Sequence, residues 1–166
     1  TANQRWFADS TYVLRGFVKV VAPARLTIDA GTRIVGDSAV AGSALFILQG
    51  ASIDAQGTAA QPIVFTSQRA VGSRQPGDWG GLVIVGRGRT NRSGRVVLEG
   101  TTAQPSDSVV YSGGTDDADN SGVLRYVRVE FAGYPVLPNA ELNTFTFAAV
   151  GSGTRLEYLQ AMAGLD

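Results

Sequence analysis

An acidic segment, residues 115–120, holds the densest group of side chains that could bind a metal ion. It reads TDDADN, so the carboxylates of Asp116, Asp117 and Asp119 follow one another closely beside an amide. Calcium prefers such oxygen ligands, although the glycine and the glutamate that complete an EF-hand loop are missing here. The segment therefore predicts either a calcium site at Asp116, Asp117 and Asp119 or a solvated turn whose side chains accept hydrogen bonds from nearby backbone amides.

An arginine-rich segment, residues 87–95, is a second candidate for binding. Arg87, Arg89, Arg92 and Arg95 alternate with small or polar residues. On an extended strand Arg87 and Arg89 would share one face, and that face would suit an acidic polysaccharide, a phosphate surface or an acidic protein. The alternative is an ordinary solvated loop. The Gly-Lys-Ser/Thr ending of a P-loop is missing, so the segment is not a P-loop.

The two tryptophans have separate interpretations. Trp79 follows a Pro-Gly pair and precedes two glycines, where it could stack on a sugar ring or cover apolar surface of the fold. The structural role is the one we favour. Trp6 and Phe7, near the start of the chain, are expected to cover one end of the fold.

Carboxylates for a polysaccharide-cleaving site are present but do not form an obvious pair. A hydrolase would place two of them roughly 5–10 Å apart across the sugar. A lyase would need a basic group, yet Lys19 is the only lysine and the chain has no histidine or cysteine. We therefore predict a protein that is not an enzyme, with a polysaccharide-active enzyme as the alternative. The carboxylates in or beside expected strands are Asp29, Asp54, Glu99, Glu130 and Glu157.

Composition narrows the remaining classes. The 166 residues are 44% apolar, enough for one domain with its own core. The net charge of zero argues against a nucleic-acid partner, which requires a basic excess. The absence of cysteine and histidine removes the usual zinc and haem ligands, so no cofactor is expected apart from calcium. The longest wholly apolar run, residues 44–48, is far shorter than the roughly 20 residues of a membrane-spanning helix.

Short alternating segments separated by Gly, Asp or Pro predict an all-β fold. Two internal sequence repeats suggest a repeating coil. LTIDAGTRI (residues 26–34) aligns with FILQGASID (46–54) at an offset of 19 when Ile34 is placed on Ile53. LRYVRVEFAG (124–133) aligns with LEYLQAMAG (156–164) at an offset of 32. Imperfect repeats of this length favour a right-handed parallel β-helix, a solenoid whose coils bury their inward residues by stacking.

A β-sandwich is the alternative fold, because it also has short strands and many turns. The scarcity of Asn-Gly and Asp-Gly hairpin turns argues against it. Residues 156–162 have apolar residues at a helical spacing, but their match to 124–131 favours a strand.

We expect one domain over residues 1–166. Residues 1–24 form an N-terminal cap with the first strands. Residues 25–166 form the coils, with loop insertions near 67–79 and 101–120.

Five segments, in order, resemble a known family: LTIDAGTRIVGD (26–37), GTAAQPIVFTS (57–67), PGDWGGLVIVG (76–86), NSGVLRYVRVEFAG (120–133) and VGSGTRLEYLQ (150–160). The family consists of large exported bacterial proteins with a right-handed parallel β-helix, common in Bacteroidota and related phyla. The resemblance implies the N-terminal portion of such a protein, either a fragment, a truncated homologue or a processed form.

The resemblance also implies an exported location, in the periplasm or at the cell surface. We expect a non-catalytic structural or interaction module, or an accessory subunit that docks on a larger assembly. A protein partner or further C-terminal coils would cover the open strand edge at the end of the solenoid. The alternatives are a carbohydrate-binding or carbohydrate-cleaving module, with a glycan as partner, and a calcium-stabilised adhesin-like surface protein.

Overall fold

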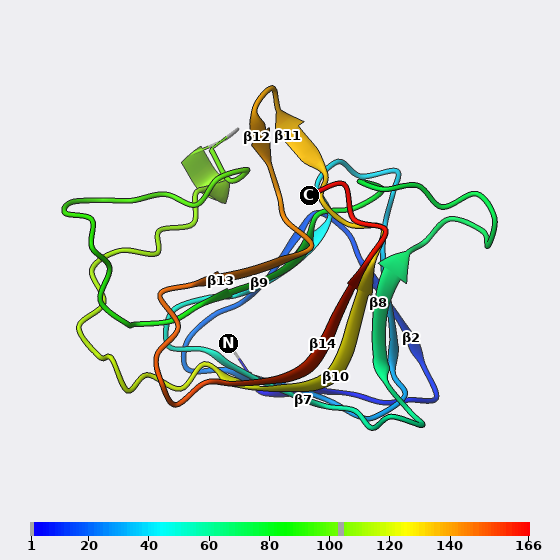
Figure 1. The fold of residues 1–166 in the computed structure, drawn as a ribbon, viewed down its shortest axis with the longest axis horizontal. Helices are drawn as coiled ribbons and strands as arrows, with labels where there is room; N and C mark the ends of the chain where they lie inside the picture. Colours follow the sequence, from blue (N-terminus) through cyan, green and yellow to red (C-terminus); the bar gives the residue numbers. More distant parts are fainter. Residues whose placement is uncertain (1, 103–104) are drawn as a thin grey trace.

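The computed structural model describes residues 2–102 and 105–166 and folds them into a right-handed parallel β-helix. Figure 1 looks down the solenoid axis, and the strands stack along the line of sight on three sides of a triangle. The first three coils are β1 (Gln4–Trp6), β2 (Thr11–Leu14), β3 (Phe17–Val20), β4 (Arg25–Ile28), β5 (Arg33–Gly36), β6 (Ala44–Ile47), β7 (Ser52–Gln56), β8 (Ile63–Ser67) and β9 (Gly81–Val85). The later elements are a 3-10 helix (Pro105–Asp107), β10 (Gly122–Glu130), β11 (Pro135–Leu137), β12 (Ala140–Glu141), β13 (Phe145–Ala148) and β14 (Arg155–Met162).

Each side of the solenoid is a stack of parallel strands from successive coils. Side one contains β1, β4 and β7, side two contains β2, β5 and β8, and side three contains β3, β6, β9 and β13. The long strand β10 belongs to two sides, since its first half pairs with β7 and its second half with β8. β14 pairs with β10 on both halves. The bend between the halves lies at Tyr126 in β10 and at Tyr158 in β14.

This parallel pairing excludes the β-sandwich alternative, which is built from antiparallel sheets. Within the described residues, antiparallel pairing is confined to β11 with β12 and to an isolated bridge between Val97 and Val110. Residues 155–162 form a strand, as the repeat predicted, rather than a helix.

The two repeats of the sequence have different outcomes. The offset of 32 is confirmed, because Leu124 pairs with Leu156. The prediction that the offset of 19 residues is the length of one coil is wrong. Ile28 lies in β4 on side one, whereas Ile47 lies in β6 on side three. The true neighbour of Leu26 on the next coil is Ile53, 27 residues later.

The offset of 19 instead aligned two corners of the same solenoid. Gly31 and Gly50 follow strands on different sides, and both have a positive φ, 82° and 80°. Glycine adopts this conformation without the steric cost that a Cβ imposes.

The core fills the triangle with inward side chains from all three sides. Ile34, Ile53 and Phe65 are fully buried there, and burying such a side chain stabilises a fold by about 1.5–3 kcal/mol. Side three is also covered on its outer surface, where Leu98 and Val109 pack on Phe46 and neighbouring residues. Strands buried on both faces have near-continuous apolar sequences, which explains ALFI in β6 and GLVIV in β9.

Two connections leave the solenoid. Residues 68–80 join β8 to β9 and project from the corner between sides two and three (Figure 1); we call this segment the strap. Residues 86–121 join β9 to β10 and lie outside side three (Figure 1). They contain the expected insertions near 67–79 and 101–120, of which residues 103 and 104 lie outside the described part.

Residues 1–24 were expected to hold a cap and the first strands. Their strands β1, β2 and β3 make the first coil, each pairing with its successor in the second coil. Trp6 packs against the core and stacks on Tyr12, with ring centroids 4.8 Å apart, whereas Phe7 is 49% exposed. Trp6 alone therefore helps to cover this end. No helix in the described residues is long and apolar enough to cross a membrane.

Candidate functional site

The acidic segment lies in the outer connection before β10, and its three aspartates have different partners. Asp116 Oδ1 accepts a hydrogen bond from a backbone amide two residues later, at 3.0 Å. Asp117 Oδ2 is 3.2 Å from Nη1 of Arg89. Asp119 is buried, and its Oδ2 accepts a hydrogen bond from the Ser121 hydroxyl at 2.9 Å.

These contacts are those of a turn whose side chains hydrogen-bond locally. Over residues 2–102 and 105–166, no three or more carboxylate, histidine or cysteine side chains gather as metal ligands would. Calcium binding at Asp116, Asp117 and Asp119 stays a prediction.

The arginine-rich segment forms a loop. β9 ends at Val85, so Arg87 and Arg89 are not on a strand and the shared face that we considered is wrong. Arg89 pairs with Asp117, and both side chains are well exposed. Arg87, Arg92 and Arg95 are exposed as well. The solvated loop is the interpretation that the structure supports.

Trp79 has the structural role that we favoured. It is fully buried at the end of the strap and lies parallel to Phe65, with centroids 6.4 Å apart. Its Nε1 donates a hydrogen bond to the backbone O of Glu130 at 2.7 Å. A buried ring cannot meet a ligand from solvent, so sugar stacking at Trp79 is wrong.

Three of the candidate carboxylates lie on the outside of side one, and each pairs with an arginine. Asp29 is 2.9 Å from Nε of Arg5, and Glu157 is 3.3 Å from Nε of Arg125. Asp54 accepts hydrogen bonds from Gln56 and Arg25. Burial alone would raise the pKa of Asp54, but these hydrogen bonds and the charge of Arg25 outweigh burial and hold that pKa below its ordinary value.

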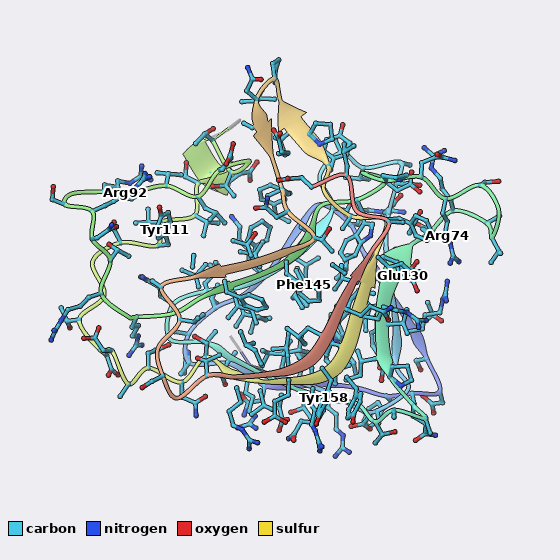
Figure 2. All side chains as sticks on the ribbon, viewed as in Figure 1. Arg74, Arg92, Tyr111, Glu130, Phe145 and Tyr158 are labelled. Atoms are coloured by element: carbon cyan, nitrogen blue, oxygen red, sulfur yellow. The ribbon has the colours of Figure 1, made fainter. Side chains whose placement is uncertain are left out.

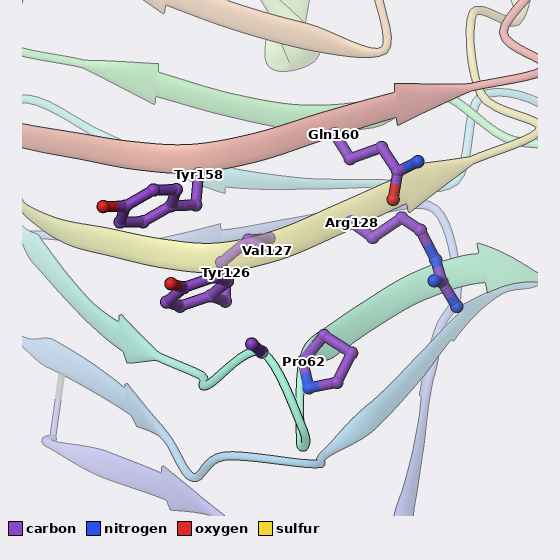
Figure 3. Close-up of a pocket in the computed structure, with 7 residues that line it drawn as sticks. Pro62, Tyr126, Val127, Arg128, Tyr158 and Gln160 are labelled. Atoms are coloured by element: carbon purple, nitrogen blue, oxygen red, sulfur yellow. The ribbon is translucent and has the colours of Figure 1, made fainter.

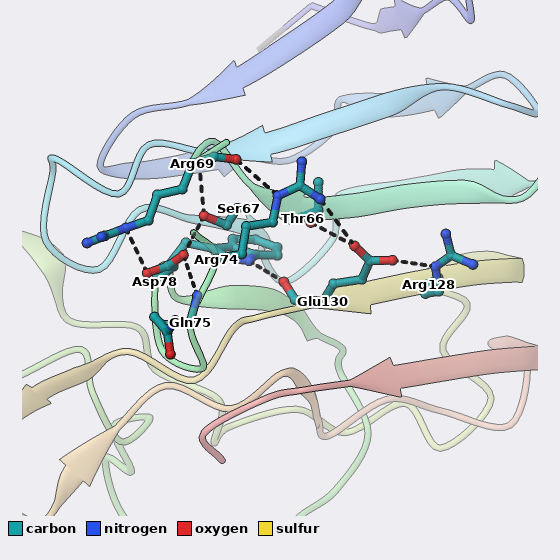
Figure 4. Close-up of polar contacts among 9 residues, drawn as sticks. Thr66, Ser67, Arg69, Arg74, Gln75, Asp78, Arg128 and Glu130 are labelled. Atoms are coloured by element: carbon teal, nitrogen blue, oxygen red, sulfur yellow. Dashed lines mark hydrogen bonds and ion pairs between the residues drawn. The ribbon is translucent and has the colours of Figure 1, made fainter. Parts of the chain in front are cut away.

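The fourth carboxylate, Glu130, is buried between the strap and side two (Figure 4). Its Oε2 accepts a hydrogen bond from the Thr66 hydroxyl at 2.8 Å and lies 4.0 Å from Nη1 of Arg74 in the strap. Its Oε1 lies 2.6 Å from Nε of Arg128. That nitrogen makes no hydrogen bond within the described residues, so the contact is an ion pair. The fifth carboxylate, Glu99, is exposed in the outer connection of side three.

A pocket of about 270 Å³ lies at the corner between sides one and two. Figure 3 shows the rings of Tyr126 and Tyr158 on one side of it, Arg128 and Gln160 on the other, and Pro62 below. The two rings stack with centroids 4.4 Å apart and planes 7° from parallel. Tyr158 is 63% exposed, so one face of the stack is open to solvent.

Basic and amide groups surround this aromatic stack. The guanidinium carbon of Arg125 lies 5.3 Å from the centroid of Tyr126 and 5.7 Å from that of Tyr158, a cation–π arrangement. Arg128 and Gln160 are neighbours in the strand register and line the opposite wall. An apolar ring face beside hydrogen-bond donors suits a flat ligand with polar edges.

We did not single out this pair of tyrosines from the sequence, although a signal was present. The aligned repeats LRY and LEY place Tyr126 and Tyr158 at the same position of successive coils. Residues at matching positions of neighbouring parallel strands lie side by side. Aligning outward residues as well as apolar ones would have predicted the aromatic stack.

A second exposed surface lies on the last coil. Leu156, Met162 and Leu165 are 37%, 38% and 57% exposed. Phe145, half-buried, points into the triangle at this end (Figure 2).

A family model described as a pectate-lyase-like beta helix domain matches residues 1–166. No curated protein and no solved structure matches the chain. The match agrees with the parallel solenoid described above.

Proposed function

The chain belongs to the family of pectate-lyase-like β-helix domains, and from that premise we propose that it is a non-catalytic module that binds a glycan at the corner pocket. Membership of this family supports a carbohydrate-related or structural module. The observation that carries the proposal is the exposed stack of Tyr126 and Tyr158, with arginine and glutamine side chains within the same pocket.

The chemistry of the pocket supports a sugar. The C–H face of a pyranose ring packs on the open face of Tyr158, because an aromatic face is both apolar and electron-rich. Hydroxyl or carboxylate groups at the ring edge then meet the donors of Arg128 and Gln160. None of these three residues belongs to an arrangement of nucleophile and base, so binding without cleavage is what we propose.

Calorimetric titration tests this proposal with two probes, hexagalacturonate as an acidic glycan and cellohexaose as a neutral one. We expect at least one to bind, and Tyr158→Ala to weaken that binding about tenfold or more. Phe7→Ala is the matched control, since Phe7 is a comparably exposed aromatic residue at the other end of the solenoid. The proposal would be contradicted if the wild type bound neither probe, or if Tyr158→Ala and Phe7→Ala lost the same affinity. A reducing-sugar assay on the same samples should detect no cleavage.

A second candidate function is docking on a protein partner through the last coil. The exposed Leu156, Met162 and Leu165 favour it, since exposed apolar side chains are stabilised when a partner removes them from water. The test is a pull-down from native membranes with the wild type and with Leu156→Asp. A partner retained equally by both would count against docking at this surface.

An exported location, in a Bacteroidota-type bacterium, completes the proposal. It rests on the five segments that resemble exported β-helix proteins and on the family to which the chain belongs. Fractionation of the source cells would place the protein in the periplasm, at the cell surface or in the cytoplasm, and recovery in the cytoplasm would contradict export.

A further inference from the structure

We infer that Glu130 is a positioning residue for the corner pocket: it holds Arg128 so that the two terminal nitrogens of that arginine face the bound glycan. The inference rests on the glycan-binding function proposed above and adds a residue that lies outside the pocket.

Arg128 connects the pocket to the buried network of Glu130. Its Nε is buried and lies 2.6 Å from Oε1 of Glu130. Arg128 is also one of the residues that line the corner pocket. Within residues 2–102 and 105–166, no hydrogen bond joins a terminal nitrogen of Arg128 to another residue, and Nε is the nitrogen through which Arg128 pairs with Glu130. One edge of the guanidinium is therefore fixed by the protein, and the other edge is left for a ligand.

Glu130 is itself held in place by two other groups. The Thr66 hydroxyl donates a hydrogen bond to its Oε2. Arg74 brings a second positive charge to 4.0 Å from the same oxygen, and a hydrogen bond from Arg74 Nε to the Arg69 carbonyl at 3.0 Å fixes Arg74 in the strap. A buried carboxylate held at Oε2 in this way is a rigid support for the arginine at Oε1, because moving it would leave charge unpaired in a low dielectric.

Fixing the arginine matters for affinity. A free arginine side chain loses several rotatable bonds when it contacts a ligand, whereas Arg128 is already ordered by Glu130. Without the carboxylate, the guanidinium would sample other rotamers and the pocket would present no fixed donors beside the tyrosines.

The experiment is a double-mutant cycle measured by calorimetry with hexagalacturonate and cellohexaose. We expect Glu130→Gln to weaken binding about fivefold to tenfold and Arg128→Met to weaken it at least as much. In the Arg128→Met background, Glu130→Gln should have no further effect, because Glu130 acts through Arg128. A general structural defect would instead weaken binding by the same factor in both backgrounds.

Asp78→Asn is the matched control. Asp78 is a second buried carboxylate held by the strap, with a hydrogen bond from Ser67 Oγ at 2.6 Å and an ion pair with Arg69 at 3.0 Å, but it does not contact Arg128. We expect Asp78→Asn to lower stability and leave affinity unchanged. If Glu130→Gln does not fold, Glu130→Asp keeps the buried charge while withdrawing it from Arg128, and should weaken binding alone.

The inference is overturned if the folded Glu130 variant binds the glycan with wild-type affinity. It is also overturned if the losses of binding free energy in the double-mutant cycle are additive, or if Asp78→Asn loses as much affinity as Glu130→Gln. Wild-type protein that binds neither probe would overturn the proposed function first, and the inference with it. The two failures are therefore distinguishable.

Discussion

The ring of Tyr158 lies on the ring of Tyr126 one coil below, with centroids 4.4 Å apart. Both residues sit at the bend of a strand that crosses from side one to side two, and both have a left-handed backbone, with φ of 55° and 47°. The same spacing of 32 residues relates Phe131 and Ala163, which also have positive φ, 59° and 51°. The later coils thus have a left-handed backbone at residues other than glycine at these positions.

Ala149, with φ 51° after β13, allows the strain of such corners to be measured. A left-handed conformation costs a residue with a Cβ roughly 1–2 kcal/mol, and glycine avoids most of this cost while losing some chain entropy. We expect Ala149→Gly to raise the free energy of unfolding by about 0.5–1 kcal/mol in urea denaturation. Ala148→Gly, in the adjacent strand position, should lower it by about 1 kcal/mol. If Ala149→Gly and Ala148→Gly changed the free energy of unfolding equally, the backbone at Ala149 would not be strained.

Gly36 marks a close approach between side two and the strap. A Cβ at this position would lie 2.5 Å from Cγ of Trp79, inside van der Waals contact. Because Trp79 is fully buried, it cannot move aside into solvent. We expect Gly36→Ala to destabilise the protein by about 3 kcal/mol in urea denaturation, as overpacking does. Gly94→Ala is the control: its Cβ would meet nothing within 4 Å, so it should cost only about 1 kcal/mol from its positive φ. A milder effect at position 36 than at position 94 would disprove the overlap.

Asp54 gives a pH dependence whose sign is fixed by its lowered pKa. A carboxyl group with a lower pKa in the folded state contributes stability above its unfolded pKa, and that contribution is lost as the pH falls through the folded pKa. Asp54→Asn should therefore be less stable than the wild type at neutral pH, by about 1 kcal/mol or less because Arg25 is half exposed. The difference should shrink in urea denaturation in the acid range. Asp9→Asn, which alters an exposed carboxylate, is the control and should leave the free energy of unfolding at neutral pH unchanged. A difference that grows in acid would refute the argument.

Much of the solenoid was predictable from sequence because its inward residues repeat. The offset of 32 between residues 124 and 156 reflects the true coil, since both segments are single strands that bend at the same corner. The offset of 19 failed for a physical reason. Two different corners of this solenoid consist of a strand, a glycine turn and a strand, so the corners at Gly31 and Gly50 have similar sequences although they are on different sides.

The corner pocket was less predictable, because it depends on contacts between residues far apart in the chain. Arg128 is brought to Glu130 by their shared strand, but the carboxylate is buried beneath the strap, which places Arg74 beside it.

The acidic segment resembled a metal site in the sequence because its three aspartates are close together along the chain. Asp117 instead faces Arg89 and Asp119 is turned toward Ser121.

Those separate partners lead to a prediction about calcium. A bound ion would need the carboxylates of Asp116, Asp117 and Asp119 to converge, which would break the Arg89 ion pair and expose a hydrogen-bonded buried oxygen. We expect the melting temperature to change by less than about 1 °C between excess chelator and millimolar calcium, because a ligand stabilises only the state that it binds. Asp117→Asn should behave as the wild type in both buffers. A clear rise in melting temperature with calcium that Asp119→Asn abolishes would instead establish the metal site, and would show that the segment rearranges around the ion.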